Sequence, residues 1–386
     1  MRILSIALLV AGTCVAAPFV PADSKQILET LPEAPAGSFS RELSQMRREL
    51  ARDPRNLELA TRVARRYIER ARAEADPRYL GYAQAALSPW WEQRASPASV
   101  LVLRATIRQN LHDFAGALAD LTAALEIEPR NPQAWLTRAT IQQVRGEFAE
   151  ALHSCRALER LAGELVATAC WAGAASMSGQ AEAGYERLRD ALARQRGAPP
   201  GVRQWAITSL AEMAARQGRN RLAEGHFREA LAVGEPDPYL KAAFADFLLD
   251  EGRNAEVAAL LNTEIRADNL LLRLTLAEMA LRLPRASGHV DALKARFGAA
   301  RMRGDSLHRR EEARFALHVL SEPQEALRLA QQNWASAHRE SWDARIYLEA
   351  ALASGNPGAA RPVLDWLRAN RVQDVKLAAL AEQAAR

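Results

Sequence analysis

The sequence predicts an all-α protein built as a right-handed solenoid of stacked antiparallel helix hairpins, with about eight units and a C-terminal capping helix. Three observations carry this prediction. Aromatic residues make up only 6% of the 386 residues, which disfavours sheets, because strands are enriched in aromatic and β-branched residues. Apolar residues recur at helical spacing along much of the chain. The pattern of residues 98–131 is repeated in 132–165, and tandem repeats of about 34 residues are typical of helical arrays.

The first element, residues 1–17, has the pattern of an export signal and not of a folded helix. Arg2 gives it a positive start, an apolar run follows, and Ala16 or Ala17 suits cleavage. The run is shorter than the roughly 20 residues that span a bilayer, and no later segment reaches that length. We therefore expect a periplasmic or secreted protein without a transmembrane segment. The alternative, a lipoprotein acylated on Cys14, is disfavoured because the preceding residues do not match a lipidation site. Usage of 47 Arg against 4 Lys indicates a bacterial source.

The second and third elements lead into the repeats. Residues 18–38 are rich in proline, which fixes φ and removes backbone donors, so we expect an extended linker. Residues 39–97 are expected to form N-terminal helices with one enlarged repeat. Pro54 and Pro129 stand at the same repeat position, and they are 75 residues apart, about seven more than two units of 34. This insertion falls at 74–77 or at 90–91.

The clearest repeats cover residues 98–165. The sequence Arg-Ala-Thr-Ile at 104–107 recurs at 138–141, and Phe114 pairs with Phe148 at the same offset. Proline cannot continue a helix, so a proline late in the first unit ends its second helix. Small residues stand where the two helices of a hairpin cross, and they allow the helix axes to approach to about 8–10 Å: Ala105, Ala117 and Ala124.

This pattern resembles the tetratricopeptide repeat family. The family unit is about 34 residues long. It has small residues at positions 8, 20 and 27, an aromatic residue near position 17 and a proline at position 32; Phe114 and Pro129 occupy the last two. The similarity is strongest over 98–165 and extends through weaker units to residue 371, with 372–386 as a capping helix. The resemblance implies a superhelix whose concave groove binds a protein or an extended peptide, and it does not identify the partner.

In this family the first helix of each unit lines the groove, and the resemblance transfers that role to nine positions. Most are polar and could hydrogen-bond a peptide backbone: Val102, Thr106, Gln109, Asn110, Leu136, Thr140, Gln143, Thr208 and Glu212. Further residues continue the face and make it more charged: Trp205, Arg216, Tyr239, Asp246 and Asp250.

Two adjacent tryptophans, Trp90 and Trp91, stand apart from the repeats. They cannot both face a helical core, because neighbouring residues of a helix point in different directions. Either one of them caps the N-terminal units, or both anchor a partner, since tryptophan is enriched at the centre of interfaces.

Cys155 and Cys170 lie about seven residues before and after the turn near Gly163. In an antiparallel helix pair, residues equidistant from the turn lie at the same height, so the two sulfur atoms could meet. An oxidising compartment would allow a disulfide. The alternative is a pair of buried thiols.

The sequence contains no motif for catalysis, a cofactor or a metal. Phosphate-binding loops, nucleophile elbows and zinc-protease motifs are missing, and no two of the seven His stand four residues apart. His308 with Glu311 and Glu312 could form a metal face, but we expect an exposed charged helix. Asp246, Asp250 and Glu251 form an acidic cluster that we expect to be solvated. We therefore predict a non-enzyme without cofactors, for which a small-molecule ligand is disfavoured.

These observations predict a periplasmic scaffold that holds a protein or peptide within an envelope assembly. One alternative is an exopolysaccharide or cell-wall factor that contacts glycan or a synthase, and a lesser one is an accessory unit of an enzyme. Nucleic acid is excluded mainly by the export signal. The net charge of +5 also arises from alternating acids and bases and not from a basic patch.

Overall fold

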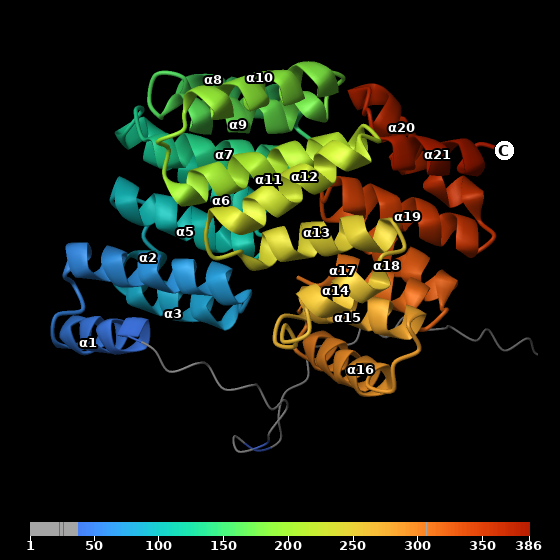
Figure 1. Ribbon diagram of the computed structural model, residues 1–386. Coiled ribbons are helices and arrows are strands. Elements are labelled where there is room, and N and C mark those ends of the chain that lie inside the picture. The colour runs from blue at the N-terminus through green and yellow to red at the C-terminus, as the bar shows by residue number, and fades with distance from the viewer. Residues whose placement is uncertain (1–22, 24–25, 27–37, 306) are drawn as a thin grey trace, which may run out of the picture.

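The computed structural model describes Asp23, Gln26, residues 38–305 and residues 307–386. The predicted leader 1–17, including Cys14, and almost all of the linker 18–38 lie outside these residues. The part of the chain that is described consists of helices and their connections, without strands (Figure 1). The all-α solenoid prediction is therefore confirmed.

The helices follow one another as antiparallel pairs. An N-terminal group comes first: α1 (Ser38–Arg52), α2 (Leu57–Glu74), α3 (Arg78–Ala86) and the single turn α4 (Ser88–Trp91). Eight pairs follow: α5 (Ala98–Asn110) and α6 (Phe114–Ile127), α7 (Pro132–Val144) and α8 (Phe148–Leu158), α9 (Glu164–Ser176) and α10 (Ala181–Arg194), α11 (Pro200–Arg216) and α12 (Asn220–Val233), α13 (Pro238–Asp250) and α14 (Asn254–Leu260), α15 (Asp268–Ala280) and α16 (Ala286–Met302), α17 (Arg309–His318) and α18 (Pro323–Ala335), α19 (Ser341–Ala353) and α20 (Arg361–Asn370). The last helix is α21 (Val375–Ala384), which lies within the predicted cap.

The small residues of the repeat lie where the helices cross. Ala105, Ala117 and Ala124 are each 0% exposed, and Ala139 and Ala151 of the next unit are equally buried. Bulkier side chains there would push the helix axes apart. The aromatic rings Phe114 and Phe148, at the start of the second helices, fill the adjacent space and are also buried.

The turn inside each hairpin needs one residue with positive φ. Gly146, Gly179, Gly218 and Gly252 supply it in four hairpins, with φ between 71° and 82°. His112 holds the same place in the first hairpin, with φ of 61°. A side chain in this conformation costs about 1 kcal/mol or more, so another contact of His112 must offset that cost.

The enlarged N-terminal repeat owes most of its extra length to α2, which has 18 residues where α5 has 13. Helix α3 therefore begins 21 residues after the start of α2, whereas α6 begins 16 residues after the start of α5. The turn α4 replaces the end of the second helix, because α3 and α4 together span 78–91, the length of α6. This single turn stands between hairpin α2–α3 and helix α5, and it contains Trp90 and Trp91. Of the two predicted insertion points, the structure therefore favours the one at 74–77.

The C-terminal helices run along the turns of the first five hairpins. Arg339 N–H donates to the Val144 carbonyl (2.8 Å), and the Ala181 N–H donates to the Gln373 side chain (2.9 Å). A Cβ added to Gly218 would lie 3.6 Å from Val375. Figure 1 shows α20 and α21 beside the ends of the earlier helices. The solenoid therefore curves back on itself, an arrangement that the repeat pattern did not predict.

A disulfide joins α8 to α9. Cys155 and Cys170 are both 1% exposed, and their Cα atoms lie 5.6 Å apart. This separation is ordinary for a disulfide. The bond ties the second strong repeat to the weaker one that follows.

Candidate functional site

Seven of the nine predicted groove residues retain accessible surface on the first helices of their hairpins. They lie on α5, α7 and α11: Thr106, Gln109, Asn110, Leu136, Thr140, Gln143 and Glu212. Val102 and Thr208 are corrected to core positions, because they are only 6% and 3% exposed. At these two positions the repeat pattern assigned core residues to the groove.

Several of these polar groups are already used within the helices. The hydroxyls of Thr106 and Thr140 donate to carbonyls four residues earlier, as threonine commonly does inside a helix. The Asn110 amide donates to the Thr106 carbonyl (2.8 Å). The Gln143 amide lies so close to α9 that a Cβ on Gly173 would come within 2.5 Å of its oxygen. Among the described residues, the Gln109 amide has no hydrogen-bond partner.

Glu212 and Tyr239 meet across two hairpins on this face. The Tyr239 hydroxyl, from α13, donates to a Glu212 carboxylate oxygen on α11 (2.8 Å). Burial, with smaller contributions from Glu340 and Asp246, raises the pKa of Glu212 above its ordinary value, although Arg216 and the hydroxyl act the other way. The Tyr239 residue remains 56% exposed.

The two adjacent tryptophans pack against the N-terminal core. Trp90 and Trp91 are both partly buried beside the cluster formed by α1–α3 and α5. Their backbone carbonyls accept hydrogen bonds from the Arg104 guanidinium. The Arg108 guanidinium also lies over the Trp91 ring, 5.8 Å from its centre. The pair therefore helps to close the N-terminal units, and a role as partner anchor stays a prediction.

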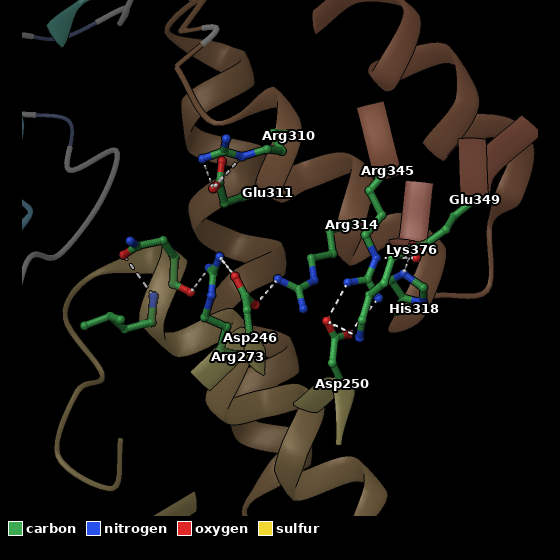
Figure 2. A network of polar contacts seen from close by, with 12 residues as sticks. Asp246, Asp250, Arg273, Arg310, Glu311, Arg314, His318, Arg345, Glu349 and Lys376 are labelled. Carbon is green, nitrogen blue, oxygen red and sulfur yellow. Dashed lines mark hydrogen bonds and ion pairs between the residues drawn. The ribbon is translucent and has the colours of Figure 1, made fainter. Parts of the chain in front are cut away.

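A buried ionic cluster joins α13, α15 and α17. Asp246 accepts hydrogen bonds from Arg273 and Arg314, each at 2.6 Å, as Figure 2 shows. All three residues are 5–6% exposed. Burial alone would raise the pKa of Asp246, but Arg273 and Arg314 outweigh it and keep the pKa below the ordinary value. The expectation that Asp246 is solvated was wrong, because its two partners come from helices 27 and 68 residues away.

A second ionic cluster attaches the C-terminal helices to α13. Arg345 of α19 binds both oxygens of Asp250 at 2.8 Å, and Lys376 of α21 lies 2.6 Å from the same carboxylate (Figure 2). Arg345 also donates to Glu349, which contacts His318. These contacts explain how α19 and α21 are held where the solenoid curves back.

Between the two ionic clusters lies one indole ring. The guanidiniums of Arg314 and Arg345 both stand 4.2 Å from the centre of the Trp342 ring. Cation–π contacts of this kind stabilise each cation by about 0.5–2 kcal/mol. Trp342 therefore links the buried cluster around Asp246 to the C-terminal cluster around Asp250.

The predicted metal face is also part of this ionic framework. Glu311 and Glu312 are both 9% exposed, and they pair with Arg310 and Arg301. The expectation of an exposed charged helix was therefore wrong, because α17 is covered by neighbouring helices. Within the described residues no group of three His, Cys, Asp or Glu side chains is placed to hold a metal ion.

Two histidines meet at the first turn. His112, the residue with positive φ, lies 3.1 Å from His338 between Nδ1 and Nε2. Both rings also contact Phe114. Burial, followed by repulsion from His338, lowers the pKa of His112 to about 4, and burial lowers the pKa of His338 as well. This contact between turn and C-terminal segment accounts for the strained conformation of His112.

We expect the folded protein to lose stability as the pH falls from 6.5 to 4. His112 is neutral in the folded state over this window, whereas the unfolded chain, with a pKa of 6.5, takes up a proton. Lower pH therefore favours unfolding, by about 2–3 kcal/mol for this residue. Urea unfolding at pH 7 and pH 4.5 measures the loss in the parent chain and in His112→Asn, since asparagine tolerates positive φ.

The parent alone does not report on His112, because burial raises the pKa of Asp343 to about 6 and gives a pH dependence of opposite sign. The contribution of Asp343 is the same in parent and variant, so the difference between them isolates His112. The His112→Asn variant should lose less stability on acidification than the parent. His153→Gln, at an exposed position, is the matched control and should behave like the parent. Equal losses in all three proteins would contradict the prediction.

Consecutive hairpins repeat at the predicted interval. Helices α5 and α7 begin at residues 98 and 132, and α6 and α8 begin at 114 and 148, so both helices of the unit recur with the same offset. The small, aromatic and proline positions take the places that the repeat requires. The chain has the tetratricopeptide repeat fold. Among its described helices, none is both long enough and apolar enough to cross a membrane.

Comparison with known proteins gives likeness of fold only. No family model and no curated protein matches the chain. Similar solved structures include the anaphase-promoting complex assembly Cut9–Hcn1, where this chain is 14% identical over 90% of its length, covers 53% of that protein and has a TM-score of 0.41. A second is a Rap protein bound to Competence and Sporulation Factor, with 10% identity, coverage of 88% of this chain and 100% of that chain, and a TM-score of 0.47. A third is human IFIT1 with m7Gppp-AAAA, with 13% identity, coverage of 86% of this chain and 85% of that chain, and a TM-score of 0.43. The chain thus spans about half of the Cut9 chain.

Proposed function

We propose that this chain is a non-catalytic scaffold that holds a protein or an extended peptide on the inner face of its solenoid. The observation that carries the proposal is the set of polar groups on the first helices that the fold leaves available. The Gln109 amide has no partner among the described residues. The Asn110 amide donates through its nitrogen, so its side-chain oxygen can still accept a hydrogen bond, and Tyr239 is 56% exposed. Such groups can satisfy the backbone of an extended segment.

The proposal includes export to the periplasm. The leader pattern of residues 1–17 supports it. The disulfide between Cys155 and Cys170 supports it independently, because structural disulfides persist in oxidising compartments. The exclusion of nucleic acid as a partner depends on this location and stays a prediction.

A pull-down with residues 18–386 as bait tests the scaffold. Periplasmic and membrane extracts are passed over the parent chain, Gln109→Ala/Asn110→Ala, and the matched control Glu150→Ala/Arg156→Ala on the second helix of the next hairpin. We expect a captured protein whose recovery falls about tenfold with the inner-face variant, as the loss of two hydrogen bonds implies. The control should capture as the parent does. Gln143 is left intact, because it packs against α9.

The outcomes separate the alternatives. A partner that both variants retain would contradict the inner-face scaffold and move the interface to Trp90 and Trp91 or to the outer helices. Capture of no protein, together with binding of envelope polysaccharide, would favour the glycan-binding alternative. That alternative has one specific observation in its support: the exposed Tyr239 and the partly buried Trp205 stand one repeat interval apart on successive first helices, and sugars stack on aromatic rings.

A further inference from the structure

The carboxylate of Glu212 has an arginine, Arg216, nearby but no direct ion-pair partner among the described residues. Its hydrogen-bond donor is the Tyr239 hydroxyl. Arg216, one helical turn further on, donates to the Ser176 hydroxyl (3.2 Å) instead. Glu212 differs in this respect from Asp246 and Asp250, whose charges are matched by cations of the same chain.

The ring beside this carboxylate is also uncovered. The chain places arginine guanidiniums over many of its aromatic rings, among them Trp171 at 4.5 Å and Trp342 at 4.2 Å. Tyr239 is more than half exposed, and no guanidinium or ammonium group of the described residues stacks on it. A carboxylate next to an open aromatic face is the arrangement that binds a cationic side chain, through charge and through the ring quadrupole.

A second carboxylate adds negative charge beside this pair. Glu340, at the start of α19, is 43% exposed in its side chain and adds a second carboxylate near Glu212 and Tyr239. Its own partner is Arg310, at 2.7 Å. The net charge of the whole chain is +5, so attraction of a cation here is a property of this site and not of the molecule.

We propose that Glu212 and Tyr239 form a recognition site on the inner face for a lysine or arginine side chain of the bound segment. The inference rests on the proposed scaffold function and specifies the chemistry of its partner. The carboxylate would accept the charged hydrogen bond, the ring would cover the cation, and the Tyr239 hydroxyl would hold the carboxylate in place.

Selection from a random 12-residue peptide display library tests the site. The parent chain (residues 18–386), Glu212→Gln and the exposed-carboxylate control Asp190→Asn are each used as bait, after urea unfolding has shown equal stability. We expect peptides selected by the parent and by the control to be enriched in lysine or arginine at one position. The enrichment should disappear with Glu212→Gln.

Synthetic peptides then measure the contribution of each group. Replacing the enriched arginine by citrulline, or the lysine by glutamine, should weaken binding to the parent about tenfold, and should change binding to Glu212→Gln little. Tyr239→Ala should weaken binding about threefold through loss of the ring, and Tyr239→Phe less. Rising salt should weaken binding to the parent more than to Glu212→Gln.

Two results would overturn the inference. The site does not bind a cationic side chain if the selected peptides lack a lysine or arginine at one position. The same conclusion follows if Glu212→Gln selects peptides with the same basic position as the parent. If such peptides still lose binding with Gln109→Ala/Asn110→Ala, the scaffold proposal stands and the cation site alone fails. If no peptide is selected at all, the cation site fails, and the pull-down decides the scaffold proposal separately.

Discussion

Asp246→Ala should destabilise the protein by about 3–5 kcal/mol, the loss found when one partner of a buried ion pair is removed. Without the carboxylate, Arg273 and Arg314 would remain side by side, each 6% exposed. Their Nε atoms already lack partners among the described residues, so the fold offers no replacement acceptor. Urea unfolding followed by far-ultraviolet circular dichroism measures the change in free energy.

Two further variants make the result for Asp246 specific. Asp190→Ala removes an exposed carboxylate paired with Arg189 and should change stability by less than about 1 kcal/mol. The triple variant Asp246→Leu/Arg273→Leu/Arg314→Met exchanges the whole cluster for apolar side chains and should recover most of the lost stability, because no uncompensated charge remains. An Asp246→Ala variant as stable as Asp190→Ala would contradict the assigned role of the cluster.

Removing the Cys155–Cys170 disulfide should cost about 2–3 kcal/mol. The bond closes a short loop, with a sequence separation of 15 residues, and a loop of this size restricts the unfolded chain by about 3 kcal/mol. Cys155→Ala/Cys170→Ala avoids placing a hydroxyl at two positions that are 1% exposed. Urea midpoints with and without a reducing agent measure the effect.

The double variant serves as its own control, because a reducing agent should lower the urea midpoint of the parent and leave that of the variant unchanged. Alkylation of the unfolded, unreduced protein (residues 18–386) provides a second measurement. We expect no label on either cysteine, since Cys14 lies outside this range. Labelling of both cysteines, or an equal midpoint with and without reductant, would show that the thiols are not bridged.

The repeat architecture could be predicted from the sequence because its causes are local. Small residues at the crossing positions, Pro129 at the end of a helix and a constant spacing between units act within one hairpin or between neighbours. The same reasoning placed the two cysteines at equal distances from their turn, and the structure joins them. Repeat position also brought Glu212 and Tyr239 to one face, where they form a hydrogen bond.

The return of the C-terminal helices was decided by tertiary structure. The curvature of a solenoid accumulates from small rotations between units, so no local pattern shows which distant residues will meet. His112 meets His338 and Asp250 meets Arg345 across 226 and 95 residues. For the same reason Asp246 looks like a solvated acid in the sequence and is a buried ion-pair partner in the fold. Helical period identifies the inner face of each hairpin, whereas the packing of remote units determines which residues of that face remain open to a partner.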